Sequence, residues 1–185
     1  METYHYKDNF WDASTKEMPV YTEQDEHVMM LRVLHKKKRG KFSRWVSALN
    51  QEYEITDGKD IYYVQRQKSF RSWFVPSWHV YHNHQLIGEF KVTMSFLRQK
   101  LVYVPLQGER LAWKLGALSH SITVTDARDV EILKSKSSYF KIRTEHNVTV
   151  HDTEQYSPLL LVLLFHVAFE YHEMTQSAAS SGAAT

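Results

Sequence analysis

The chain has 185 residues, of which 43% are hydrophobic and 24% charged, and its net charge is +2. This composition is typical of one folded soluble domain and argues against a disordered or membrane-spanning chain. There is no cysteine, which excludes disulfide bonds, thiolate metal sites and cysteine nucleophiles.

The N-terminal segment Met1–Phe10 is polar and acidic, unlike a secretory signal, so we expect a cytoplasmic protein. Beyond it, positive charge is concentrated between His27 and Asn50, which contains seven basic residues and no acidic one. Such an excess can attract a polyanion, either a nucleic acid or an anionic membrane surface. The alternative is a solvated hairpin loop. The seven are Arg32, Lys36, Lys37, Lys38, Arg39, Lys41 and Arg44.

Between Val28 and Val150 apolar and polar residues alternate, which is the period of a β-strand. Short polar turns interrupt the alternation at nearly regular spacing, and each predicts a hairpin. A series of hairpins must close or form a sandwich to hide its edge strands. The five predicted turns are Asp57-Gly58, Asn83-His84, Gln107-Gly108, Asp126-Ala127 and Glu145–Asn147.

A basic and aromatic phrase follows several of the predicted strands. It occurs as Lys41–Trp45, Lys68–Trp73 and Ser95–Lys100, and in a diluted form as Lys134–Lys141. This recurrence suggests internal repetition of one hairpin unit.

The pattern of apolar residues changes after Tyr156, from that of strands to that of a helix. Ser157 is a suitable N-cap and Pro158 suits the first position of a helix, which we place at about Pro158–Met174. Residues 159–169 are apolar on every face except at His166. These eleven residues span about 17 Å, too short for a bilayer, so the helix should be buried inside a sheet that surrounds it. We expect His166 to be a neutral imidazole hydrogen-bonded to a carbonyl or a tyrosine.

These elements together predict one α+β, mainly β, domain over residues 1–175, a closed or nearly closed antiparallel barrel plugged by its own C-terminal helix. Residues 176–185 are small and polar, and we expect them to be a flexible tail.

The order of these elements resembles the tubby C-terminal-like superfamily, within it the LURP-one-related proteins and their small bacterial relatives, and more distantly the phospholipid scramblases. The resemblance is carried by Ser95–Arg98, Asp57-Gly58, Gln107-Gly108 and Ser157-Pro158 with the leucine run to Phe169. It covers roughly Val28–Met174. It implies about twelve antiparallel strands around the central helix. Tubby-type domains bind phosphoinositide headgroups through basic residues, whereas this chain lacks the lipidation cysteines and the acidic calcium loop of scramblases.

We therefore expect a non-enzymatic binding module that engages anionic phospholipid headgroups, or a membrane-associated protein partner, peripherally at the inner membrane face. Arginine and lysine suit phosphate, and Trp45 and Trp73 suit a headgroup interface. The alternative is a scaffold domain with no ligand. Nucleic-acid binding ranks below lipid, because no recognition-helix, RNP-like or zinc-finger signature is present. The predicted headgroup site consists of Lys36, Lys37, Lys38, Arg39, Lys41, Arg44, Arg71, Arg98 and Lys100.

A third hypothesis, ranked lower, is a metal-binding or enzymatic barrel. His79, His82 and His84 lie close together in sequence, and imidazole is a good zinc and copper ligand. In a regular strand, however, His79 and His82 point to opposite faces, so these three are weak candidates. We find no catalytic motif and predict no cofactor.

Overall fold

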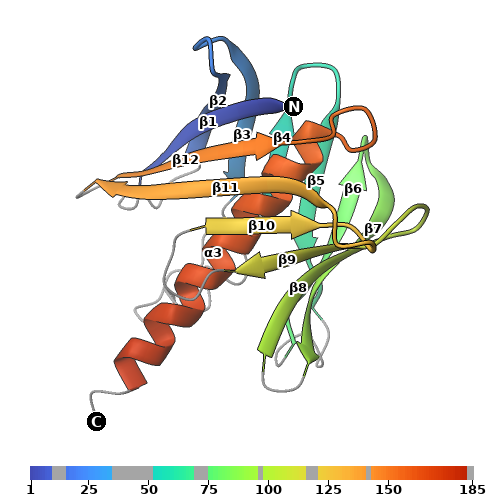
Figure 1. The fold of residues 1–185 in the computed structure, drawn as a ribbon, viewed down its shortest axis with the longest axis vertical. Coiled ribbons are helices and arrows are strands. Elements are labelled where there is room, and N and C mark those ends of the chain that lie inside the picture. The colour runs from blue at the N-terminus through green and yellow to red at the C-terminus, as the bar shows by residue number, and fades with distance from the viewer. Residues whose placement is uncertain are drawn as a thin grey trace.

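A computed structural model describes residues 1–9, 16–34, 52–68, 75–95, 98–115, 121–140 and 143–182. Within these described residues, twelve antiparallel strands form a closed barrel, and one helix, α3, completes the fold (Figure 1). The mainly β class and the barrel that closes around the C-terminal helix, both predicted from the sequence, are confirmed. The elements are β1 Glu2–Asn9, β2 Lys16–Thr22, β3 His27–Leu34, β4 Glu52–Thr56, β5 Ile61–Arg66, β6 Ser77–His82, β7 Gln85–Ser95, β8 Arg98–Pro105, β9 Leu111–Leu115, β10 Ser121–Thr125, β11 Glu131–Phe140, β12 Arg143–Val150 and α3 Pro158–Gly182.

Strand β1 closes the barrel, because it pairs with β12 on one side and with β2 on the other. Its pairing with β12 runs from Glu2↔Val150 to Asn9↔Arg143. Its pairing with β2, within the described parts of both strands, is limited to Tyr4↔Thr22 and His5↔Tyr21. Among the described residues, the pairing between β1 and β2 therefore ends at His5.

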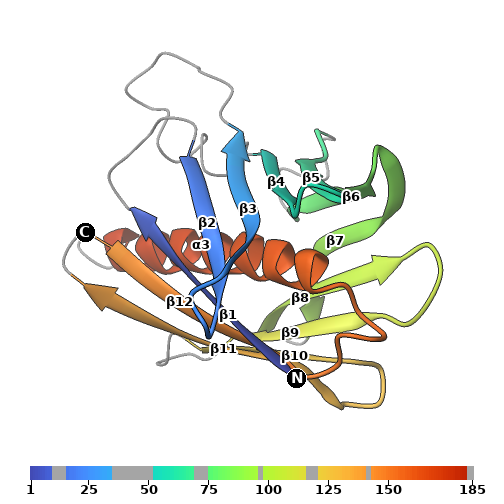
Figure 2. The ribbon, with the colours of Figure 1, turned by 90° about the horizontal axis from the view of Figure 1, so that it is seen from above.

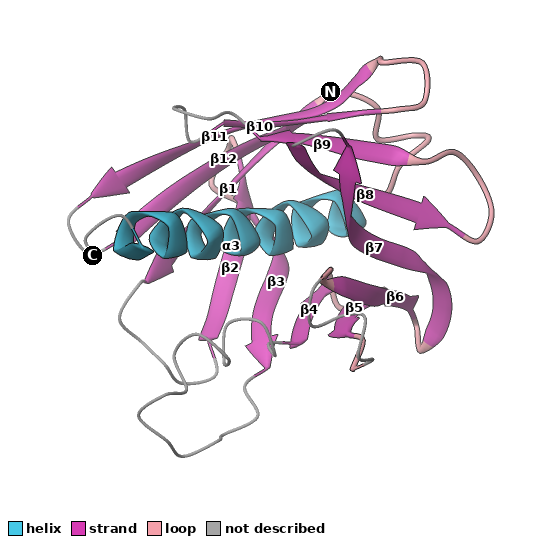
Figure 3. Cartoon of the chain, turned by 90° about the horizontal axis from the view of Figure 1, so that it is seen from below, coloured by secondary structure: helices cyan, strands magenta, loops and turns pink. Residues whose placement is uncertain are grey.

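Helix α3 is the core of the molecule. Ser157 caps it, accepting a hydrogen bond from the Leu160 N–H at 3.5 Å, as the sequence predicts. All side chains from Leu159 to Phe169 are buried, and the helix runs through the barrel with strands on its sides (Figures 2 and 3). It continues to Gly182, past the predicted end near Met174, so the helix includes residues 176–182 of the expected tail. Alanine and serine in this stretch permit helix, and no proline interrupts it.

Four of the five predicted turns join strands where expected. At the β4–β5 turn Gly58 has a φ of +90°, and the Asp57 carboxylate accepts N–H bonds from Lys59 and Asp60, both at 2.8 Å. At the β6–β7 turn Asn83 and His84 have φ of 46° and 68°, as a two-residue hairpin turn of type I′ requires.

The fifth predicted turn is wrong. Strands β11 and β12 are joined at residues 141–142, and Glu145–Asn147 lies within β12. The reason is that His146 and Thr144 face the barrel interior, so polar residues occupy positions at which the pattern predicts apolar ones. The first 25 residues contain two strands, β1 and β2, that no pattern in the sequence indicated.

Strand direction defines two ends of the barrel. At the helix-start end lie the turns that follow even-numbered strands, the segment that leads into Pro158, and the beginning of β1. At the helix-exit end, the odd-numbered strands finish and the next strands begin.

Candidate functional site

A group of polar side chains lines the barrel interior on the side of β1, β11 and β12, towards the helix-exit end. The rest of the described core is mainly apolar. The group includes two polar side chains of α3, those of His166 and Glu170. We call it the inner polar cluster; its members are Tyr6 and Asp8 of β1, Ser137 of β11, His146 of β12, and His166 and Glu170 of α3.

His166 is held by a tyrosine, as predicted. Its Nδ1 lies 3.1 Å from the Tyr6 hydroxyl, and the imidazole is 1% exposed. Glu170 follows four residues later, so both side chains project from one face of the helix. Asp8, on the strand that closes the barrel, completes a group in which one nitrogen or oxygen atom from each of Asp8, His166 and Glu170 lies within 4.8 Å of the other two.

His146 is fully buried beside this group. Its Nδ1 lies 2.9 Å from the Ser137 hydroxyl oxygen, and its ring packs 4.7 Å from Tyr6 and 4.5 Å from Phe169 between centroids. Burial lowers the pKa of His146 to about 3, and the neighbouring His166 adds to this effect. Burial also raises the pKa of the Tyr6 phenol well above its usual value. Both side chains are therefore neutral at pH 7.

The depressed pKa of His146 predicts a pH-dependent stability. Below pH 6.5 the unfolded chain binds a proton at this imidazole, whereas the folded chain does so only near pH 3. The free energy of unfolding should therefore fall by about 1.4 kcal/mol per pH unit through this window. Urea unfolding at pH 7.5 and pH 5.5 should show that the free energy of unfolding falls more in the wild type than in His146→Gln. Equal losses in the two proteins would contradict the assignment.

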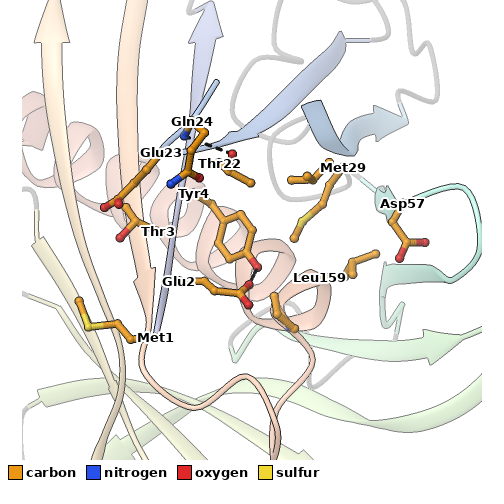
Figure 4. Close-up of a pocket in the computed structure, with 12 residues that line it drawn as sticks. Met1, Glu2, Thr3, Tyr4, Thr22, Glu23, Gln24, Met29, Asp57 and Leu159 are labelled. Atoms are coloured by element: carbon orange, nitrogen blue, oxygen red, sulfur yellow. Dashed lines mark hydrogen bonds between the residues drawn. The ribbon is translucent and has the colours of Figure 1, made fainter. Parts of the chain in front are cut away.

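A pocket of about 630 Å³ opens at the helix-start end (Figure 4). Its lining combines apolar side chains with carboxylates, and the Tyr4 hydroxyl donates to the Glu2 carboxylate. These carboxylates repel phosphate, so the pocket does not suit an anionic headgroup. The apolar residues are Met1, Val28, Met29, Pro158 and Leu159, and the carboxylates are those of Glu2, Glu23 and Asp57.

The three clustered histidines do not converge. His82 is held by Asp60, with 2.9 Å between Nε2 and Oδ1, and stacks on Tyr62 at 4.3 Å. His79 contacts Tyr81 on the other face of β6, and His84 is exposed in the following turn. Among the described residues, the group with metal-ligand spacing is instead Asp8, His166 and Glu170. The local sequence around Asp8 does not mark it as a ligand, because only the closure of the barrel brings β1 to the helix.

Most of the predicted headgroup site lies outside the described residues, namely Lys36, Lys37, Lys38, Arg39, Lys41, Arg44 and Arg71. Arg98 begins strand β8, and Lys100 is exposed two residues later. The described strands that flank these residues all meet at the helix-exit end: β3 finishes at Leu34, β5 at Arg66 and β7 at Ser95.

The connections at the two ends of the barrel differ in charge. At the helix-start end, segments 23–26, 57–60, 83–84, 106–110, 126–130 and 151–157 contain ten acidic and three basic residues. At the helix-exit end, the strands are joined by segments 10–15, 35–51, 67–76, 96–97, 116–120 and 141–142, which contain nine basic residues and one acidic residue.

The connections at the two ends also differ in their content of aromatic residues. The helix-exit connections contain eight, whereas the helix-start connections contain one, Tyr156. Trp78 and Trp113, the two tryptophans outside these connections, are buried in the core. The eight are Phe10, Trp11, Phe42, Trp45, Phe70, Trp73, Phe74 and Phe96.

Within the part of the chain that the structure describes, no helix is both long and apolar enough to cross a bilayer. No protein-family model matches the sequence, and no curated protein matches it significantly.

Proposed function

We propose that this protein is a non-enzymatic binding module that attaches to anionic phospholipid surfaces through the helix-exit end of its barrel. The observation that carries the proposal is the separation of charge between the two ends. Strand direction assigns nine basic residues and one acidic residue to connections at one end, and ten acidic and three basic residues to those at the other. An anionic surface attracts the first end and repels the second, so the charge distribution favours one orientation.

The residue types at the helix-exit end suit a bilayer surface. A lysine or arginine close to an anionic membrane contributes about 1 kcal/mol, so several of them acting together give measurable binding. Tryptophan is enriched at the level of the lipid headgroups, and this end has Trp11, Trp45 and Trp73 in its connections. The acidic pocket at the helix-start end has the wrong charge for the same ligand.

The family remains part of the proposal. A twelve-stranded barrel around a hydrophobic C-terminal helix is the fold that a resemblance to the tubby C-terminal-like and LURP-one-related proteins implies. We propose that the chain is a small member of this superfamily, that it recognises phosphate-bearing headgroups, and that it acts peripherally at the cytoplasmic face of a membrane. Fold alone does not assign function, so the charge separation carries the argument.

Orientation on the membrane tests the proposal, and the absence of cysteine permits single-cysteine labelling. Lys68→Cys places an environment-sensitive fluorophore at the helix-exit end, and Gln107→Cys places one at the helix-start end; both positions are exposed. With vesicles of phosphatidylcholine and phosphatidylserine, we expect a blue shift at position 68 and an unchanged spectrum at position 107.

Two outcomes would count against the proposal. A shift at position 107 alone would place the acidic end on the membrane. Unchanged spectra at both positions would favour the alternative, a scaffold domain or a module for a protein partner. Phosphatidylcholine vesicles alone serve as the control, because they lack the negative surface charge that the proposal requires.

A further inference from the structure

We propose that Asp8, His166 and Glu170 form a binding site for one divalent first-row transition-metal ion inside the barrel. One ligand atom from each residue lies within 4.8 Å of the other two. Ligand atoms at about 2.0–2.2 Å from a common ion are at most about 4.4 Å apart. Small side-chain adjustments, of about an ångström, therefore bring the three ligand atoms onto one ion. The three residues come from strand β1 and from two successive turns of α3.

The donor set selects the class of metal. One imidazole nitrogen and two carboxylates suit Zn²⁺, Mn²⁺ or Fe²⁺. Ca²⁺ and Mg²⁺ prefer ligand sets made of oxygen alone, and Cu⁺ prefers sulfur. Three protein ligands also leave room for a water or a small anion on the ion.

The surroundings of His166 resemble those of a metal ligand. Its Nδ1 lies 3.1 Å from the Tyr6 hydroxyl, and a hydrogen bond from this nitrogen fixes the ring and directs Nε2 to the ion. Tyr53 packs edge-on against the same imidazole, with ring centroids 5.5 Å apart. Such second-layer contacts orient a histidine ligand and set its tautomer.

His146 provides an independent observation. Its ring centroid is 6.4 Å from that of His166, its side chain is fully buried, and its Nε2 has no hydrogen-bond partner among the described residues. An unpaired buried nitrogen is costly, and it occurs here beside the proposed ligand His166. A water bound to the ion would offer this nitrogen a donor.

An ion can reach the site from the helix-exit end. Glu170 is partly exposed there, whereas Asp8 and His166 are buried. Asp8 lies near the end of β1, beyond the β2-paired residues Tyr4 and His5. An ion at this position would tie the strand that closes the barrel to its central helix, so binding should stabilise the fold.

The test is titration of the chelator-treated full chain with ZnCl₂ and with MnCl₂, followed by calorimetry and thermal unfolding. We expect one ion per chain for at least one of these metals and a melting temperature several degrees higher, with much weaker responses to MgCl₂ and CaCl₂. Glu170→Gln should weaken binding at least tenfold, and Asp8→Asn should do the same.

Matched variants distinguish this site from the surface histidines. Glu173→Gln changes another carboxylate of the same helix, and His82→Gln changes the histidine held by Asp60; neither should weaken binding. Asp8 is buried, so Asp8→Asn also alters packing, and the partly exposed Glu170 is therefore the deciding position. Absence of stoichiometric binding, or binding that survives Glu170→Gln and is lost in His82→Gln, would overturn the proposal. Vesicles play no part in this test, so its result is independent of the membrane proposal.

Discussion

Leu164→Asp should abolish folding. Leu164 is 0% exposed, and the residues from Leu159 to Phe169 around it are all buried in the barrel. Truncating a buried leucine costs about 2–5 kcal/mol, and burying a carboxylate without a partner adds several more. Together these exceed much of the roughly 5–15 kcal/mol by which a domain is stable. We therefore expect insoluble protein, or soluble protein without a cooperative thermal transition in circular dichroism.

Leu106→Asp is the matched control, because it makes the same chemical change at a leucine that is 67% exposed in the β8–β9 turn. It should fold and melt close to the wild type. If Leu164→Asp were soluble with a wild-type melting temperature, the central helix would not be the core of this molecule.

The combined variant Lys37→Glu, Arg39→Glu and Arg44→Glu should lose at least about 100-fold in affinity for anionic vesicles. Each basic residue contributes about 1 kcal/mol at such a surface, so removing three costs about 3 kcal/mol, and the new carboxylates add repulsion. The affinity should be measured by flotation with vesicles that contain phosphatidylserine, after circular dichroism has shown that the variant is folded.

A second triple variant, Lys59→Glu, Arg110→Glu and Lys134→Glu, changes the net charge by the same amount at exposed positions away from the helix-exit end. It should bind far better than the first variant, because local rather than total charge governs contact with the surface. Equal loss of affinity in both variants would mean that net charge alone controls association, and that the helix-exit end is not a binding surface.

The central features of the fold are readable from the sequence because they have strong local signals. A helix that is apolar on all sides and too short to span a bilayer has to be enclosed by protein, and Ser157-Pro158 marks its beginning. Turns such as Asp57-Gly58 and Asn83-His84 require backbone conformations that few residues adopt. The strand count came from the family resemblance rather than from the pattern.

The errors occur where polar residues face inward. Thr144 and His146 are polar residues at buried positions of β12, and Asp8 is one at a buried position of β1. They interrupt the alternation of apolar and polar residues from which a strand is predicted. One contact of the inner polar cluster was predicted in outline: His166 was expected to bond a carbonyl or a tyrosine, and the structure shows Tyr6. Tyr6 is 160 residues away, and barrel closure is what brings β1 against the helix. No local pattern encodes such a long-range contact.

The most direct measurement of the central claim is flotation of the wild-type protein with neutral and with anionic vesicles at low and at high salt. We predict binding to phosphatidylserine-containing vesicles at low ionic strength, weaker binding as salt rises, and none to phosphatidylcholine alone. Protein that stays in the soluble fraction under all four conditions, or binds both vesicle types equally and independently of salt, would contradict attachment through the basic end of the barrel.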